Sequence, residues 1–198
     1  MIIDYIEDDS RERRNKPCIH KIWGVDVAIN SGNMAYFLPL LIIKNAQIDD
    51  KKKNQLYEVV VEEMVKLHLG QGLDIYWHNG GLGTDEELYL QMCAFKTGTL
   101  ARMAARFAAV LGNASKNQSA ALARFAESIC VAFQIQDDIL NITNTSWGKE
   151  FGEDISEGKR TLMVIRALER GKEEDKKRLL SILNKKTKEK ESIKQAIE

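Results

Sequence analysis

The segment FQIQDDILN, residues 133–141, decides the fold class, because it sets polar side chains at helical spacing inside an otherwise apolar stretch. Four polar residues recur there at i, i+3, i+4 and i+7, the spacing of one helix face. They are Gln134, Asp137, Asp138 and Asn141. Apolar residues at helical spacing continue towards the N-terminus and predict one long helix over residues 117–142. We expect this helix to be buried along its apolar flank.

The rest of the chain shows the same helical pattern, with only two prolines in 198 residues and no convincing strand alternation. Thr84 and Glu87 have capping-box spacing and predict the start of a helix that runs to Leu111. Gly70 and Gly72 are expected to weaken the preceding helix, and Pro39 to kink or break an earlier one. Further helices are expected over residues 55–69 and 159–169, with Gly171 as a left-handed stop and a solvated or frayed tail from residue 184. We predict an all-α protein with a single domain, residues 1–198.

Composition excludes several classes of function. Lys and Arg number 29, and so do Asp and Glu, which gives no electrostatic reason to expect binding to nucleic acid. The apolar run over residues 34–43 is about half of what a bilayer crossing needs, so no membrane span is predicted. With no readable targeting signal and three widely separated cysteines, we expect a cytoplasmic protein with reduced thiols.

A second acidic cluster, DYIEDD, occupies residues 4–9. Asp4 and Asp8 are one helical turn apart and would repel each other unless a cation lies between them. Oxygen ligands without a neighbouring His or Cys suit Mg²⁺. A solvated acidic face explains this first cluster about equally well. It explains Asp137 and Asp138 less well, because two carboxylates in an apolar segment are costly to bury unpaired.

Cationic residues follow both acidic clusters closely in sequence, which indicates a phosphate-bearing ligand held between metal ions and basic side chains. They are Arg11, Arg13, Arg14 and Lys16 after the first cluster, and Lys149, Lys159 and Arg160 after the second. Ordinary surface pairing with residues 7–9 is the simpler alternative for Arg13 and Arg14.

Five segments together resemble the trans-isoprenyl diphosphate synthases, most closely the geranylgeranyl diphosphate synthases. They follow the family's order over roughly residues 2–170: DYIED with SRERRNKP at 4–17, GQGLDIYW at 70–77, KTG at 96–98, FQIQDD at 133–138 and GKEFGEDISEGK at 148–159. Five motifs in order are a far more specific signal than one acidic motif.

The resemblance implies an isoprenoid-synthase-type helical bundle around a deep central pocket, usually in a homodimer. Its reaction joins an allylic diphosphate to isopentenyl diphosphate with Mg²⁺. The metal ligands implied are Asp4, Asp8 and Asp137, supported by Asp138, Gln71 and Asp74. The residues implied to bind the allylic diphosphate are Arg13, Lys96, Lys149 and Lys159. Arg14 would contact isopentenyl diphosphate, and Thr97 and Gln134 would border the developing cation. Asp4, Asp8, Lys96, Asp137 and Lys149 are the expected catalytic residues.

The sequence also departs from the family pattern. Tyr5 replaces the second aspartate of the first motif, and Asn141 stands where many members carry Asp. The family has helices before the first motif, including a Gly-Lys-x-x-Arg segment for isopentenyl diphosphate, and more helices after the last. We expect a domain shortened at both ends. Two hypotheses follow: a synthase making a short-chain product such as the C20 diphosphate, or a non-catalytic or split subunit that needs a partner chain.

Overall fold

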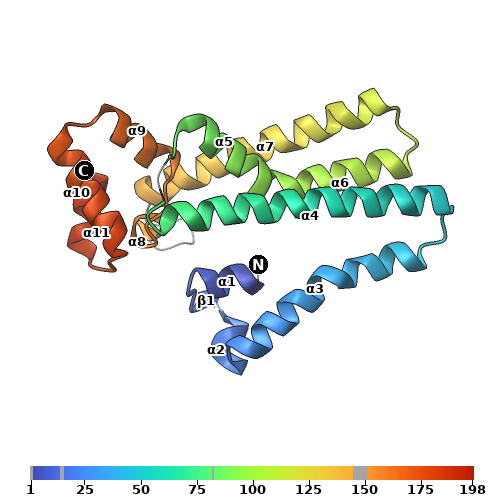
Figure 1. Ribbon diagram of the computed structural model, residues 1–198, viewed down its shortest axis with the longest axis horizontal. Helices are drawn as coiled ribbons and strands as arrows, with labels where there is room; N and C mark the ends of the chain where they lie inside the picture. The colour runs from blue at the N-terminus through green and yellow to red at the C-terminus, as the bar shows by residue number, and fades with distance from the viewer. Residues whose placement is uncertain (1, 14–15, 82, 145–150) are drawn as a thin grey trace. The chain divides into compact units, whose positions relative to one another are not determined.

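The computed structural model describes residues 2–13, 16–81, 83–144 and 151–198 (Figure 1). The described residues form helices joined by short loops and one small antiparallel strand pair, which confirms the all-α prediction. The elements are α1 (Ile2–Glu7), β1 (Glu12–Arg13), β2 (Lys16–Pro17), α2 (Ile19–Trp23), α3 (Val25–Asn45), α4 (Asp50–His78), α5 (Glu86–Lys96), α6 (Gly98–Leu111), α7 (Lys116–Thr143), α8 (Glu153–Ser156), α9 (Leu162–Arg170), α10 (Glu173–Lys185) and α11 (Lys190–Ile197).

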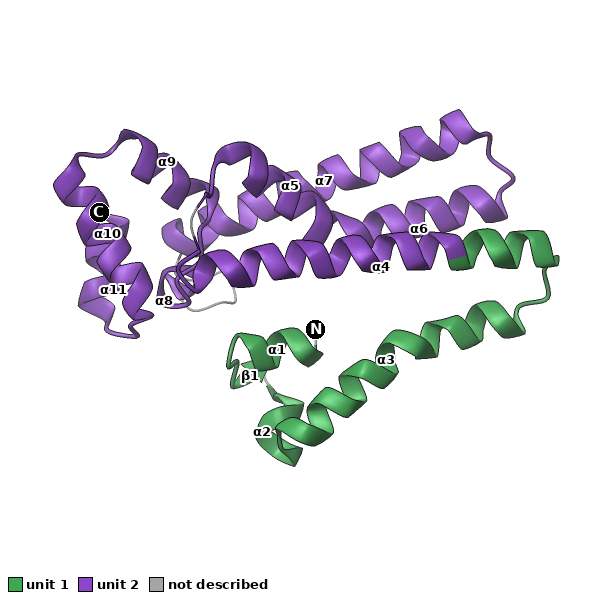
Figure 2. Ribbon diagram, viewed as in Figure 1, with its two compact units in different colours: residues 1–57 green, residues 58–198 purple. Residues whose placement is uncertain are grey.

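The chain divides into two compact units, residues 1–57 and 58–198 (Figure 2). That they form one domain stays a prediction. In the first unit α1 and α2 both pack against α3. The contact with α1 is close at Gly32, where a Cβ atom would lie 2.6 Å from Cδ1 of Ile3. The sequence predicts a kink or a break at Pro39. Helix α3 continues through this residue, so a break does not occur.

Helix α3 is long and apolar enough to cross a membrane by length and composition, and 17% of its most apolar window is buried within the structure. Core helices of soluble proteins and signal sequences meet the same two criteria. The predicted absence of a membrane span therefore stays a prediction.

The helices of the second unit differ from the predicted ones at their ends. Helix α4 runs through Gly70 and Gly72 to His78, although both glycines were expected to weaken it. Helix α5 is capped by Asp85 instead of Thr84: the Asp85 carboxylate accepts a hydrogen bond from the Leu88 N–H at 2.8 Å. The single helix predicted to reach Leu111 is two helices, α5 and α6, which meet at Thr97.

Helix α7 packs along α6 and also contacts α5 and α9. Its Val131 and Ile135 lie against a core built from buried side chains of three helices: Trp77, Tyr89, Met92, Cys93 and Ile165. On its other side Phe125, Ile129 and Phe133 are 65%, 53% and 61% exposed. The expectation that the whole apolar flank is buried was therefore wrong, because these residues belong to two different faces and only one of them meets α5, α6 and α9.

The four C-terminal helices share a second core. Its buried members come from α8 to α11: Ile155, Val164, Ile182, Leu183 and Ile193. Helix α11 is held by Ile193, so the tail is a packed helix and not a frayed one. Gly171 ends α9 with φ of −69°, not with the left-handed conformation expected from the sequence.

Candidate active site

The first pair of predicted site residues joins α4 to the end of α5. Lys96, the last residue of α5, donates from Nζ to Oδ2 of Asp74 on α4 at 2.5 Å. Both side chains are largely buried, with 25% and 10% of their surface exposed. The structure thus brings together two residues that lie 22 positions apart and were assigned to one site by resemblance alone.

A chain of hydrogen bonds links α5, the α5–α6 junction and α7. The Thr97 hydroxyl donates to Oε1 of Gln134 at 2.9 Å, and Nε2 of Gln134 donates to Oδ1 of Asp138 at 2.8 Å. The Tyr89 hydroxyl donates to the other carboxylate oxygen of Asp138 at 2.5 Å. Asp138 is 4% exposed, and these two donors fix both of its oxygen atoms.

Burial perturbs the titration of this cluster. Desolvation raises the pKa of Asp138 to about 6, and the neighbouring carboxylates of Asp154 and Asp137 add to the rise, although the bonds from Tyr89 and Gln134 oppose it. Desolvation also raises the pKa of Tyr89 above its ordinary value, so this hydroxyl stays a donor. The same cause raises the pKa of the Cys93 thiol, which lies in the core beside Tyr89, to about 12.

The segment after α7 adds a second lysine to the same unit. Lys159 lies 3.3 Å from Oδ1 of Asp154 and 2.5 Å from Oε2 of Glu157. The Asp154 main-chain N–H donates to Oδ1 of Asn141 at 3.2 Å, and the Gly152 N–H donates to the main-chain oxygen of Asn141 at 2.9 Å. Asn141 is 1% exposed and ties this segment to α7. The amide of Asn141, unlike an aspartate at this position, adds no further negative charge beside Asp138 and Asp154.

Gly70 on α4 allows the end of α5 to approach closely. A Cβ atom at this position would lie 2.5 Å from the main-chain nitrogen of Lys96 and 2.8 Å from Cβ of Phe95. The second glycine of the pair, Gly72, faces open space. The first glycine is therefore needed for contact between helices, which explains how a glycine can stand inside a long helix.

The donor set fits a hard divalent cation. Asp137 and Asp154 both raise the pKa of Asp138, so negative charge accumulates around a buried carboxylate. Within the described residues, no three Asp, Glu, His or Cys side chains are grouped closely enough to hold a metal by themselves. Such a site suits Mg²⁺, which takes one or two carboxylates and completes its coordination with water and phosphate oxygens.

The first acidic segment lies in the other compact unit. Asp8 follows α1, and its N–H donates to the main-chain oxygen of Asp4 at 3.0 Å, so the two residues are one helical turn apart as predicted. The Arg13 guanidinium lies over the Tyr5 ring, 5.3 Å from its centroid. Asp9 pairs with Lys21 at 2.5 Å.

Two predicted residues, Arg14 and Lys149, lie outside the described residues. Tyr89 was not predicted. The i, i+4, i+7 spacing of Tyr89, Cys93 and Lys96 places them on one helix face, but this spacing does not show that Tyr89 contacts Asp138. Asp154 belongs to the motif at residues 148–159 but was not predicted as a site residue by itself, and its place beside Asp138 depends on the fold of the segment after α7.

Comparison with known proteins places this geometry in context. The Polyprenyl synthetase family model matches residues 1–198. A short chain isoprenyl diphosphate synthase of Methanothermobacter thermautotrophicus is 39% identical over 186 residues, which cover 92% of this chain and 56% of that protein. A geranylgeranyl pyrophosphate synthase of Dictyostelium discoideum is 34% identical over 200 residues, which cover 100% of this chain and 62% of that protein.

Solved structures agree with these sequence matches. The crystal structure of geranylgeranyl pyrophosphate synthetase from Pyrococcus horikoshii Ot3 matches 99% of this chain with a TM-score of 0.89 and 33% identity, and 60% of that chain is covered. The present chain thus spans about 56 to 62% of the length of these three proteins. By sequence and by fold, it belongs to the polyprenyl synthetase family.

Proposed function

We propose that the chain carries the allylic-diphosphate site of a Mg²⁺-dependent trans-isoprenyl diphosphate synthase whose product is short, with geranylgeranyl diphosphate first among the candidates. The observation that carries the proposal is the convergence in the second unit of buried carboxylates, two lysines and an uncharged Thr97–Gln134 pair. This combination suits a diphosphate next to a carbon that becomes positively charged. The relatives named above are synthases of this class.

The proposed chemistry begins with cleavage of the allylic C–O bond, whose electron pair leaves with the diphosphate. Lys96 and Lys159 bind the diphosphate oxygens, and their attraction increases as negative charge develops there. Bound Mg²⁺ would supply further charge neutralisation, held by Asp137 with Asp138 and Asp74 in support. Thr97 and Gln134 border the allylic carbon without presenting a full charge to it. The isopentenyl double bond then forms the new C–C bond, and loss of a proton restores a double bond.

The remaining assignments come from the family resemblance and complete the proposal. Asp4 and Asp8 would provide metal ligands on the first acidic segment, with Arg13 on the allylic diphosphate and Arg14 on isopentenyl diphosphate. Lys149 would bind the allylic diphosphate together with Lys159. A homodimer, or a pair with a complementing subunit, and a cytoplasmic location are part of the same proposal.

The second candidate is a non-catalytic or split subunit that needs a partner chain. It is favoured by apolar side chains that stay exposed along one side of α7 and along α4. They are Phe125, Ile129 and Phe133 on α7, and Val61, Val65 and Leu69 on α4. Exposed apolar patches commonly mark surfaces that another segment or chain covers.

Ligand-induced thermal shifts test the proposed site. With farnesyl diphosphate and Mg²⁺ together at 100 times the dissociation constant, we expect about 2.7 kcal/mol of stabilisation. That corresponds to a rise in Tm of roughly 5–10 °C, and neither component alone should produce it. Asp137→Ala and Lys96→Met should abolish the shift, because each removes a proposed contact to the metal–diphosphate complex. Gln136→Ala is the matched control, since Gln136 is an exposed neighbour on α7.

Turnover separates the two candidates. Radiolabelled isopentenyl diphosphate is supplied with dimethylallyl, geranyl or farnesyl diphosphate and Mg²⁺, and the chain length of any product is measured. Extension to the C20 diphosphate supports the synthase. A thermal shift without extension supports a split subunit that needs a partner. Absence of both results contradicts the synthase and supports the non-catalytic subunit.

A further inference from the structure

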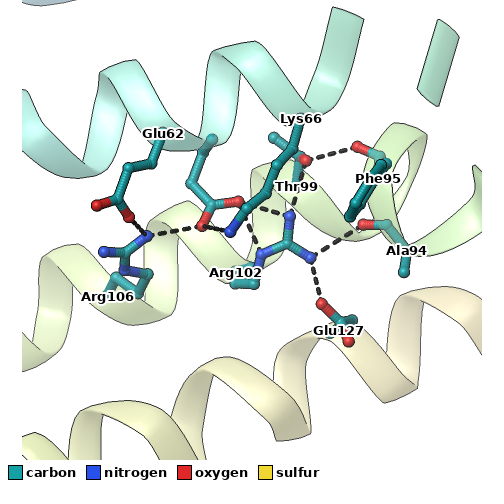
Figure 3. A network of polar contacts seen from close by, with 9 residues as sticks. Glu62, Lys66, Ala94, Phe95, Thr99, Arg102, Arg106 and Glu127 are labelled. Carbon is teal, nitrogen blue, oxygen red and sulfur yellow. Dashed lines mark hydrogen bonds and ion pairs between the residues drawn. The ribbon is translucent and has the colours of Figure 1, made fainter. Parts of the chain in front are cut away.

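Arg102 lies outside the proposed ligand contacts but contacts α4, α5 and α7 near the end of α5 (Figure 3). It sits on α6 and is 5% exposed. Its Nε donates to Oε2 of Glu63 on α4 at 2.7 Å, and Nη2 lies 2.6 Å from the same oxygen. Nη1 forms an ion pair with Glu127 on α7.

The remaining two contacts of Arg102 hold backbone and side-chain oxygens near the α5–α6 junction. Nη1 donates to the main-chain oxygen of Ala94 at 2.9 Å, and Nη2 donates to the Thr99 hydroxyl at 3.0 Å. The Thr99 hydroxyl in turn donates to the main-chain oxygen of Phe95 at 2.5 Å. All five N–H groups of the guanidinium therefore have a partner, which a lysine could not reproduce.

These contacts bind the main-chain oxygens of Ala94 and Phe95, which directly precede Lys96 and Thr97. The last four carbonyl groups of a helix have no partner within it. In α5 the Cys93 carbonyl accepts from the Thr97 N–H at 2.9 Å, while the Ala94 and Phe95 carbonyls are satisfied by the Arg102 and Thr99 side chains. The side-chain contacts thus close the end of α5 immediately before its lysine.

Stability alone is a weak reason for such a buried network. Replacing a buried ion pair by well-packed apolar residues is often neutral or stabilising, because desolvation cancels much of the attraction. The network instead fixes geometry, since one planar group binds α4, α5 and α7 at the same time. The neighbouring Arg106 lacks this property: its ion pairs go to Glu62 at 2.7 Å and Glu63 at 2.8 Å, both on α4.

We infer that Arg102 is a positioning residue for the diphosphate site: it fixes the end of α5 so that Lys96 reaches the diphosphate and Thr97 holds Gln134. The inference rests on the proposed function, because it assigns Arg102 to the same site. It concerns the direction of two side chains and not the overall stability of the fold.

The test compares Arg102→Lys with Arg106→Lys as its control. Both variants keep a positive charge next to Glu63, but Arg106 makes its ion pairs with α4 and not with α5. Affinity for Mg²⁺ with farnesyl diphosphate is measured calorimetrically well below each variant's Tm. We expect Arg102→Lys to weaken binding about tenfold or more, the scale known for residues that orient the ligands of a metal ion, and Arg106→Lys to change it less than about threefold. Amide hydrogen exchange over residues 94–98 should accelerate only in the Arg102 variant.

A double variant guards against loss of folding. Glu63→Gln with Arg102→Met removes both buried charges, so the fold should be retained. The Ala94 carbonyl still loses its donor, and we therefore expect binding of Mg²⁺ with farnesyl diphosphate to stay weak. Equal losses of affinity in the Arg102 and Arg106 variants, or full binding by the double variant, would overturn the inference and leave the proposed site intact. Absence of binding by the unmodified chain would overturn the proposed function and the inference with it.

Discussion

Replacing Gly70 by alanine is expected to lower the free energy of unfolding by roughly 1–3 kcal/mol, the usual cost of forcing extra volume into a packed interior. The added Cβ atom would lie 2.5 Å from the main-chain nitrogen of Lys96, so backbone has to move. Movement of this backbone would also withdraw Lys96 from Asp74. Urea denaturation measures the loss of stability, and the thermal shift with Mg²⁺ and farnesyl diphosphate measures the loss of binding.

Gly72 provides the matched control in the same helix. It is exposed, and a Cβ atom there meets nothing within 4 Å. Alanine is a better helix former than glycine by about 1 kcal/mol, so Gly72→Ala should raise stability by up to that amount. If both alanine variants were equally destabilised, the close approach of α4 to α5 would not be the reason for Gly70.

Asp138→Asn is expected to remove a pH-dependent destabilisation. The pKa of Asp138 is raised from 3.8 to about 6, chiefly by burial. Between those values the folded protein holds a proton that the unfolded chain has released, so stability falls as pH rises from about 4 to about 6 and stays lowered above that. One pKa unit corresponds to about 1.4 kcal/mol. The free energy of unfolding of the variant, relative to that of the unmodified protein, should therefore rise by up to about 3 kcal/mol between pH 4 and pH 7.

Urea denaturation of both proteins at pH 4, 5, 6 and 7 checks this expectation. Asp175→Asn on α10 is the control, because Asp175 is exposed and its replacement changes no buried charge. A stability difference between Asp138→Asn and the unmodified protein that does not change with pH would show that Asp138 ionises as freely when folded as when unfolded.

Much of the candidate site was predicted from sequence because its residues lie in short motifs, and the assignment of these residues to the site stays a prediction. The family resemblance assigned Lys96 and Thr97 to the site through one short motif, and helical spacing grouped Gln134 with Asp138. Their contacts in the second unit agree with that grouping. Tyr89 was missed because nothing in a single sequence shows which of several aromatic residues on a helix faces a carboxylate on another helix.

Helix ends were harder to predict than helix existence, for physical reasons visible at single residues. Thr84 and Asp85 are both good caps, and the choice between them depends on where the loop from α4 arrives. The break at Thr97 is marked by no proline, and it coincides with side chains of α6 that satisfy the last carbonyls of α5. The faces of α7 depend on which helices pack against it, which periodicity alone does not specify.

The buried thiol of Cys93 can report how often the core beside the candidate site opens. This thiol is fully buried, and burial raises its pKa to about 12, so the folded form should not react with a thiol reagent at pH 8. Reaction would require α5 to separate from α4 and α7, and its rate would report how often that separation occurs. A ligand that bridges Lys96 and α7 should slow the labelling, which offers a readout of occupancy that needs no turnover.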